Sequence, residues 1–321
     1  MEITNDKISV VMLNWNGLMY LKRTIPAVLN QDYKNFDLVI VDNGSTDGSI
    51  EYVNSFKEIK LIRNSENLGY SVGKNIGVQN ASGKFIYLID NDILLPNDKV
   101  LSNLYTNIRQ LNKNSILSLV MLNDGDAATK YYAYCYGLLG PIYNKNLLVD
   151  KITPQTYLSG APMGGNIFIS KENWDTIGGF DGAQPYYLDD FDLGARASVL
   201  GFNSFVSSDC ILIHLGKEEA IKKDKWLWKY KYFFSGYSIV IFKNYRLLNL
   251  LYRYPLFVSF SLIKTIKYCI KFCSIRPVLS LIKSIGFFVK ILPDILLERK
   301  KIQAKRVVKK DIFLKIKPIV F

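Results

Sequence analysis

Short runs of hydrophobic residues alternate with helical patterns along the first part of the chain. The runs cover residues 8–13, 36–41, 59–62 and 84–89, and their β-branched and aromatic residues predict buried strands. Helical spacing between the runs predicts helices over residues 21–30, 49–56 and 70–80. Strands that alternate with helices in this way are typical of βαβ units. The sequence therefore predicts an α/β fold with a mostly parallel sheet.

The same pattern continues more sparsely to residue 216. A helix is expected over residues 101–111, and strands over residues 116–121, 167–169 and 211–213. Because hydrophobic residues make up 49% of the 321 residues, the chain can bury a large core. The length allows one large α/β domain with an appendage, or two domains.

Two acids separated by one residue, Asp90 and Asp92, directly follow the run at 84–89. On an extended chain their side chains point the same way, about 7 Å apart. Carboxylates at the end of a buried strand are costly unless a positive charge neutralises them. Mg²⁺ or Mn²⁺ fits this pair, since either ion prefers oxygen ligands and is commonly completed by substrate phosphates. A polar turn that happens to contain two acids is the alternative.

Asp42 ends the strand predicted at 36–41 and precedes a polar cluster rich in glycine. In nucleotide-binding α/β domains, an acid at such a strand end commonly binds the base or the ribose. A helix cap or an Asx turn is the alternative reading of Asp42. The glycine-rich fingerprints of dinucleotide sites and of P-loops are absent from the sequence.

Cysteine usage and charge describe the cellular setting and divide the chain. The four cysteines form no close pair, so a reducing compartment is expected, and the first residues do not read as a signal peptide. The net charge of +13 is unevenly distributed: residues 1–215 carry 17 Lys and Arg against 22 Asp and Glu, whereas the remaining residues carry 24 against 6. We therefore expect one domain over 1–216 and a basic region over 217–321.

Several segments in the first half resemble family 2 glycosyltransferases. These are VVMLNWNG, VDNGSTDGS, NLGYSVGKNIG and IDNDILL, in that order and spacing. The resemblance covers roughly residues 8–216. It implies the GT-A fold, a nucleotide-diphosphosugar donor, a divalent metal at Asp90 and Asp92, and inversion at the anomeric carbon. It also implies a donor half over 1–96 and an acceptor half over 97–216. The donor residues expected from it are Asn14, Asn16, Asp42, Asn67, Lys74, Asp90 and Asn91, with Asp42 on a uracil or thymine base and Lys74 near the diphosphate.

A second group of segments resembles the acceptor side of the same family. It contains GGN at 164–166, IGGFD at 177–181, and the acids Asp189, Asp190 and Asp192, with Arg196 one helical turn later. The family usually has Glu at the position of Asp189. A carboxylate can take the proton that an acceptor hydroxyl loses as it attacks, so Asp190 is the expected base and Asp189 the residue that orients the hydroxyl. The remaining acceptor residues expected from the resemblance are Gly165, Asn166 and Tyr187.

Two further side chains have competing interpretations. Asp192 is expected to pair with Arg196 at i,i+4, a structural role. His214 is the only histidine of the chain and ends the strand predicted at 211–213. A lone histidine is usually structural, but related transferases place a metal ligand roughly here, so His214 is expected to complete the metal site.

The basic region combines lysines with hydrophobic and aromatic residues at helical spacing. Lys264, Lys267 and Lys271 fall on one helical face, and Ile263, Ile266, Ile270 and Cys273 lie on the other side. The charge-free runs are shorter than the roughly 18–20 residues that span a bilayer. This pattern favours amphipathic helices on an anionic membrane surface. A packing or homo-oligomer interface is one alternative, and a nucleic-acid surface is disfavoured by the many Leu, Ile and Phe residues.

Together these features predict a peripheral glycosyltransferase at the cytoplasmic face of the cell membrane. It would transfer a sugar from a UDP- or dTDP-sugar, with Mn²⁺ or Mg²⁺, to a hydroxyl of a lipid-linked glycan in surface-polysaccharide synthesis. The alternatives are a sugar-1-phosphate nucleotidyltransferase and a catalytically inactive scaffold that binds sugar or lipid. Metal-dependent binding of UDP that Asp92→Ala abolishes would separate the enzyme from the scaffold.

Overall fold

The computed structural model describes residues 5–125, 133–137, 140–144, 156–184, 188–216, 223–311 and 314. Tyr187, which the sequence predicts on the acceptor side, lies outside these residues.

A mixed sheet with the strand order β3-β2-β1-β4-β10-β6-β11-β5 forms the centre of the described chain, and β9 pairs with β11. The strands are β1 (Ile8–Asn14), β2 (Phe36–Asp42), β3 (Ile59–Arg63), β4 (Phe85–Asp90), β5 (Ile93–Leu94), β6 (Ser115–Asn123), β9 (Thr156–Ser159), β10 (Asn166–Ser170) and β11 (Asn203–His214). Strands β1 to β4 are parallel, as are β6 and β11, whereas β10 runs antiparallel between β4 and β6. Strands β7 (Ala133–Gly137) and β8 (Gly140–Asn144) form a separate antiparallel pair.

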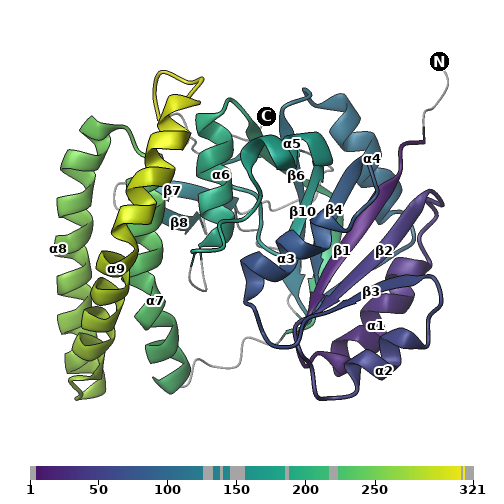
Figure 1. Cartoon of the computed structure of the whole chain (residues 1–321), viewed down its shortest axis with the longest axis horizontal. Helices are drawn as coiled ribbons and strands as arrows, with labels where there is room; N and C mark the ends of the chain where they lie inside the picture. The colour runs from purple at the N-terminus through teal and green to yellow at the C-terminus, as the bar shows by residue number, and fades with distance from the viewer. Residues whose placement is uncertain are drawn as a thin grey trace.

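Helices cover both faces of the sheet (Figure 1). They are α1 (Leu18–Leu29), α2 (Ser49–Asn54), α3 (Tyr70–Gln79), α4 (Val100–Gln110), α5 (Lys171–Ile177) and α6 (Asp189–Val199). Alternate residues of β1 point to opposite faces: Val10 packs in the core shared with α1 and α4, whereas Val11 packs in the core shared with α3, α5 and α6. The period of two along the strands thus produces a three-layer α/β fold.

The predicted α/β fold with a mostly parallel sheet is confirmed. Strand β11 is the main difference, because it spans twelve residues where the sequence predicts only 211–213. Its first part is rich in polar residues, and its pairing with β6 shifts register between Ser207 and Ile211. A polar strand with a bulge lacks the hydrophobic alternation from which strands are recognised.

Three long helices form the C-terminal region, and they lie side by side at the end of the molecule opposite to α1 and α2 (Figure 1). They are α7 (Lys223–Asn244), α8 (Leu247–Phe272) and α9 (Arg276–Ala304). One hydrophobic cluster joins them to the sheet domain, since Phe191 and Val199 of α6 pack with Phe234, Phe257 and Leu281. The hydrophobic core therefore continues across residue 216. Within the described ranges, the helices are too short or too polar to cross a membrane.

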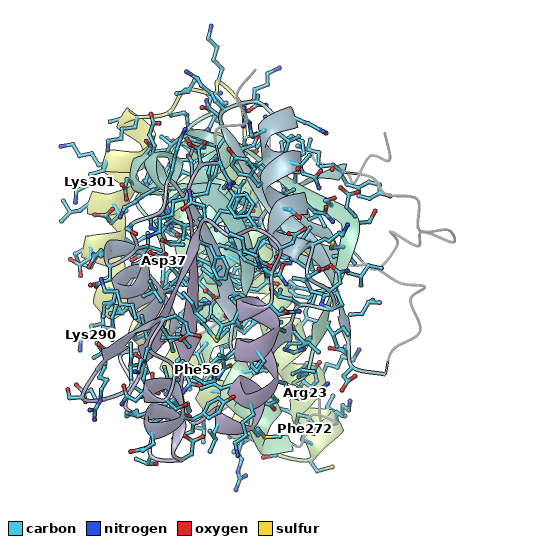
Figure 2. The ribbon with its side chains drawn as sticks, turned by 90° about the vertical axis from the view of Figure 1, so that its right-hand side faces the viewer. Arg23, Asp37, Phe56, Phe272, Lys290 and Lys301 are labelled. Atoms are coloured by element: carbon cyan, nitrogen blue, oxygen red, sulfur yellow. The ribbon has the colours of Figure 1, made fainter. Side chains whose placement is uncertain are left out.

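The outer side of α8 and α9 exposes many large hydrophobic side chains. Exposed residues of this kind in the two helices are Leu247, Leu248, Leu251, Tyr252, Leu256, Phe260, Leu262, Ile263, Ile266, Ile270, Leu279, Ile282, Ile285, Phe287, Val289, Leu296 and Leu297. We call this set the apolar surface. Lysines accompany it, and Figure 2 shows Lys290 and Lys301 at the outer side of α9. Helix α8 contains no Asp or Glu.

Candidate active site

Polar side chains gather at the carboxyl edge of the parallel strands. Asn14, Asp42 and Asp90 end β1, β2 and β4, and Asn123 and His214 end β6 and β11. Parallel strands bring their carboxyl ends to one edge of a sheet, where open α/β folds bind ligands. The register confirms this placement, because Asn14 pairs with Asp42 and Asn123 pairs with His214.

A hydrogen-bonded chain of side chains joins three of these strand ends. Asn14 Nδ2 donates to Asp42 Oδ2 over 2.8 Å, and Asn91 Nδ2 donates to Asn14 Oδ1 over 2.7 Å. The backbone N–H of Ser45 donates to Asp42 Oδ1 over 2.7 Å. Asp42 and Asn14 are buried. One oxygen of Asp42 thus binds Asn14, and the other binds the backbone of the β2–α2 loop, as the Asx-turn interpretation predicts.

Asn16 and Asn67 shape the loops above this chain. Asn16 adopts a φ of +50°, a region that asparagine tolerates, and its Oδ1 accepts from the backbone N–H of Thr46 over 2.8 Å. Asn67 Oδ1 accepts from the Gly69 N–H over 2.9 Å and from Asn43 Nδ2 over 3.2 Å. Both predicted donor residues therefore lie at the carboxyl edge, where they order the loops that border it.

The carboxylate of Asp90 forms an ion pair with the buried side chain of Lys74. Lys74 Nζ is 2.9 Å from Asp90 Oδ1 and donates to the Ile89 carbonyl over 2.5 Å, with its side chain fully buried. The hydroxyl of Tyr70 bonds to Asp90 and accepts from the Gly165 N–H over 3.1 Å. Lys74 therefore holds Asp90 from the interior, and its expected approach to the diphosphate stays a prediction.

Gly165 has no room for a side chain beside Asp90. It has a φ of +76°, and a Cβ there would lie 2.3 Å from Asp90 Oδ2. The backbone N–H of Asp90 donates to the Gly165 carbonyl over 3.0 Å. The predicted acceptor residue Gly165 is thus packed directly on the predicted metal acid.

Asp92 and His214 meet across the sheet. His214 Nε2 is 3.1 Å from Asp92 Oδ2, and His214 Nδ1 is 3.2 Å from Asn123 Oδ1. Strand β5 pairs with β11 so that Ile93 lies opposite His214, and the Leu215 N–H donates to the Asp92 carbonyl over 2.8 Å. A Cβ on Gly216 would lie 2.6 Å from Asp92 Oδ2. Because Gly216 has no side chain, residue 216 does not cover the side chains of Asp92 and His214.

The side chains of Asp92 and His214 could both bind a divalent cation. An amide oxygen only accepts, so Asn123 Oδ1 favours a proton on His214 Nδ1, and when the ring is neutral the lone pair of Nε2 faces the carboxylate of Asp92. Two acceptors this close repel each other unless a proton or a cation lies between them. Within the described residues no three His, Cys, Asp or Glu side chains are grouped as metal ligands. One or two carboxylates completed by phosphates are usual for Mg²⁺, and Asp92 fits that pattern, whereas an imidazole ligand such as His214 favours a transition metal such as Mn²⁺.

The acid pair Asp189 and Asp190 begins α6 near the same edge. The Gly164 N–H donates to Asp190 Oδ2 over 3.2 Å, and a Cβ on Gly164 would lie 2.8 Å from that oxygen. Burial and the like charge of Asp190 raise the pKa of Asp189 well above its usual value. Burial and the charges of Asp90, Asp189 and Asp190 likewise raise the pKa of Tyr70, which stays a proton donor. Tyr70 thus lies between the acid that ends β4 and the pair on α6.

Two expected residues have structural positions. Asp192 is buried and pairs with Arg196 Nε over 2.8 Å, as predicted. Asn166 is fully buried, donates to the Leu119 carbonyl over 2.5 Å and accepts from the Tyr87 hydroxyl over 3.3 Å. The amide of Asn166 thus joins β10 to β6 inside the sheet, and its predicted acceptor role stays a prediction.

Sequence reasoning missed three residues of the site. Tyr70 lies within the segment NLGYSVGKNIG, but nothing in that segment indicates that its hydroxyl bonds to Asp90 and is close enough to feel the charges of Asp189 and Asp190. Asn123 and Gly216 lie beside His214 only because β6 and β11 pair. Asn123 could have been identified from a predicted pairing of β6 with β11, because it lies opposite His214 in that pairing.

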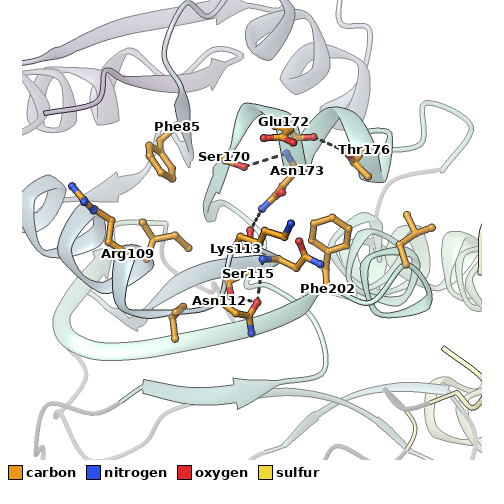
Figure 3. A pocket seen from close by; sticks show the side chains of 14 residues that line it. Phe85, Arg109, Asn112, Lys113, Ser115, Ser170, Glu172, Asn173, Thr176 and Phe202 are labelled. Atoms are coloured by element: carbon orange, nitrogen blue, oxygen red, sulfur yellow. Dashed lines mark hydrogen bonds between the residues drawn. The ribbon is translucent and has the colours of Figure 1, made fainter. Parts of the chain in front are cut away.

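A separate cavity of about 580 Å³ lies at the opposite edge of the sheet. It is lined by the first residues of β4 and β6, Phe85 and Ser115, and by Ser170 at the end of β10. Figure 3 shows Asn173 bridging it, with Nδ2 donating to the Lys113 carbonyl over 2.7 Å. This cavity is lined by none of the acids described above.

Residues 9–172 match the model of the family described as "Glycosyl transferase family 2". This chain belongs to that family. An uncharacterized glycosyltransferase of Haemophilus influenzae is 39% identical over 97 residues, which are 29% of this chain and 39% of that protein. The chain thus spans less than half the length of this curated relative. A putative teichuronic acid biosynthesis glycosyltransferase of Bacillus subtilis, TuaG, is 23% identical over 70% of this chain and 85% of its own length.

The fold is similar to that of a solved GT-A structure. GalNAc-T7, in a crystal structure with UDP, GalNAc and Mn²⁺, superposes with a TM-score of 0.62 at 17% identity, over 79% of this chain and 50% of that one. The expected GT-A fold with a C-terminal helical region is therefore present. At this identity the likeness concerns the fold alone.

Proposed function

We propose that this protein is an inverting glycosyltransferase that uses a UDP- or dTDP-sugar. The observation that carries the proposal is the convergence, at one sheet edge, of Asp42, Asp90, Asp92 and His214 with the acid pair of α6. Membership of glycosyl transferase family 2 supports the reaction class. The nucleotide and the metal in the GalNAc-T7 structure are consistent with this kind of donor.

In this proposal the donor lies over the ends of β1, β2 and β4. Asp42, Asn14 and Asn91 form a rigid polar floor, because each is held by the hydrogen-bonded chain. Asp92 and His214 would hold Mn²⁺ or Mg²⁺, with Asp90 beside them. Such an ion would stabilise the charge that develops on the leaving nucleotide diphosphate. Lys74 holds Asp90 from below, so its role is to position that carboxylate.

The acid pair would accept the proton of the acceptor hydroxyl. Asp190 is the base predicted from sequence, and the hydrogen bonds from Gly164 and Phe191 orient its two oxygens. Burial and the like charge of Asp190 raise the pKa of Asp189, and a raised pKa makes its carboxylate a stronger base. We therefore assign the proton to the pair, which titrates as a unit.

The apolar surface of α8 and α9 supports a membrane-bound acceptor. Exposed hydrophobic patches of this kind commonly mark interaction sites, and the lysines around it favour an anionic lipid surface. We propose that these helices lie on the cytoplasmic face of the membrane. The acceptor would then be a lipid-linked glycan of a surface polysaccharide, in keeping with the name of the TuaG relative.

The test is a screen of UDP- and dTDP-sugars for hydrolysis or transfer that depends on Mn²⁺. We expect one donor to be consumed, EDTA to stop the reaction, and Asp92→Ala to abolish the effect of Mn²⁺ on UDP binding. Asp98→Ala is the control, because Asp98 is an exposed acid six residues after Asp92, beyond β5. If Asp92→Ala binds UDP with the same dependence on Mn²⁺ as Asp98→Ala, the metal assignment is wrong.

A further inference from the structure

A buried ion cluster joins the sheet domain to the C-terminal helices. We define the ion cluster as Asp181, Asp192, Arg196, Lys243 and Asn244. Lys243 Nζ lies 2.5 Å from Asp181 Oδ2 and 2.9 Å from Asp192 Oδ2. Asn244 Nδ2 donates to the other oxygen of Asp192 over 3.0 Å. The side chains of Lys243 and Asp192 are 1% and 0% exposed, so water does not compete for these contacts.

The ion cluster fixes the first turn of α6. Asp192 follows the acid pair by two residues on the same helix, and its backbone N–H donates to the Leu188 carbonyl over 2.9 Å. Arg196 donates to the Ile177 and Gly179 carbonyls over 2.8 and 2.6 Å, which ties α6 to the loop after α5. The position of Asp189 and Asp190 therefore depends on how this turn is held.

Helix α7 reaches the ion cluster with its last turn, and α9 holds that turn in place. Arg299 donates to the carbonyls of Phe242 and Tyr245, and Gln303 donates to those of Lys243 and Asn244. Arg306 also donates to the Asn244 carbonyl, over 2.6 Å. Basic groups at a helix C-terminus bind its unpaired carbonyls and favour its dipole. Contacts thus run without a break from α9 through α7 to the turn that carries the acid pair.

A requirement for stability alone does not explain a buried lysine here. Burying two charges costs about as much as their attraction returns, and well-packed hydrophobic residues often serve equally well. A buried ion pair fixes the relative position of its two partners, because only one arrangement satisfies its charges and hydrogen bonds. The buried charges of Lys243 and Asp192 set the register between α6 and α7.

We infer that Lys243 is a positioning residue, through which the C-terminal helices hold the Asp189–Asp190 pair in its working place. The inference rests on the proposed function of that pair. It makes α7 to α9 part of the catalytic unit and not a detachable anchor. Lys243 acts through Asp192, since its recorded ion pairs are with Asp181 and Asp192.

Three variants of the full chain test the inference. Lys243→Met removes the charge, Lys243→Arg keeps it, and Ile295→Ala is the control. Ile295 is 1% exposed and packs with Ile239 and Phe288 in the same helical region, so its truncation loosens the helices without touching the ion cluster. Asn244→Ala, a milder change to the same contacts of Asp192, replaces Lys243→Met if that variant does not fold.

Two measurements apply to each variant. Amide hydrogen exchange over residues 188–193 reports the order of the first turn of α6 and needs no substrate. Turnover with the donor found in the screen, together with affinity for UDP, separates the acid pair from the donor site. We expect Lys243→Met to raise exchange in this segment and to lower turnover at least tenfold, with UDP affinity within twofold of wild type. We expect Lys243→Arg to restore most of the turnover and Ile295→Ala to retain it.

The inference is overturned if exchange over residues 188–193 is the same in Lys243→Met and wild type. It is also overturned if turnover stays within twofold, or if Ile295→Ala reproduces the whole pattern. If the wild-type protein consumes no nucleotide sugar, the proposed function fails. Hydrogen exchange alone then decides whether Lys243 holds this turn.

Discussion

Substitution of Gly165 by alanine tests the contact between the GGN segment and Asp90. A Cβ at residue 165 would lie 2.3 Å from Asp90 Oδ2, so Asp90 must move by about 1 Å to restore ordinary contact. Alanine at a φ of +76° also costs about 1–2 kcal/mol in backbone strain. Because a displacement of about 1 Å near the chemistry can cost on the order of 100-fold in rate, we expect turnover to fall by 10- to 100-fold.

Gly201→Ala provides a matched control for this substitution. Gly201 has a φ of +85°, so alanine suffers the same backbone strain, but its Cβ would meet nothing closer than Val307 Cγ1 at 3.6 Å. In both variants the melting temperature should fall by about 2–4 °C for each kcal/mol of backbone strain. Only Gly165→Ala should also weaken the dependence of UDP binding on Mn²⁺, measured by calorimetry. Equal UDP binding and equal turnover in the two variants would refute the assignment of Asp90 to the donor site.

Three further predictions follow from the same structure. Asp190→Asn should lower transfer by about 10²- to 10⁴-fold while UDP affinity is unchanged, because the pair acts on the acceptor. Although burial opposes ionisation of Asp192, Lys243 and Arg196 lower its pKa to about 2 from the usual 3.8. The resulting stability, about 2 kcal/mol, is complete above pH 3.8 and is lost as the pH falls through 2, so Asp192→Asn should flatten acid unfolding followed by circular dichroism in that interval. Leu248→Ser combined with Ile263→Ser should reduce binding to phosphatidylglycerol vesicles at least about tenfold in co-sedimentation.

Each of these predictions has an outcome that contradicts it. Transfer by Asp190→Asn at the wild-type rate would assign the proton to Asp189 alone. An unchanged acid-unfolding curve in Asp192→Asn would mean that its ion pairs do not stabilise the fold. For the vesicle experiment, Met19→Ser is the control, since Met19 is 69% exposed on α1, outside the apolar surface. Equal vesicle binding by this control and the double variant would argue that the apolar surface binds a partner other than lipid.

The fold and the strand-end acids could be predicted because their signals are local. Hydrophobic runs identify β1 to β4, and Asp42, Asp90 and Asp92 follow those runs directly. The role of Lys74 could not be predicted in the same way. The family resemblance places Lys74 near the diphosphate, but its side chain is fully buried and ion-paired with Asp90, and sequence shows a charge without showing its burial. Asn166 illustrates the same difficulty, since its amide satisfies backbone groups of a strand 47 residues away.

Contacts between distant segments were beyond the reach of local pattern. Lys243 and Asp192 are 51 residues apart, and no spacing rule connects a lysine at the end of α7 to an acid in the first turn of α6. The predicted amphipathic character of α8 is present, although Lys264 is half-buried and lies 3.8 Å over the ring of Phe233. Which residues of α8 are exposed and which are buried depends on how α7 packs against it. Periodicity within α8 cannot reveal that packing.

The short ladder between β5 and β11 has a consequence for how the protein comes into being. Asp92 is made early and His214 more than a hundred residues later, and the pairing of β5 with β11 brings them together. A nascent chain that has left the ribosome only as far as β6 therefore contains Asp92 without its histidine partner. Any activity that needs both side chains therefore requires β11 to have entered the sheet beside β5.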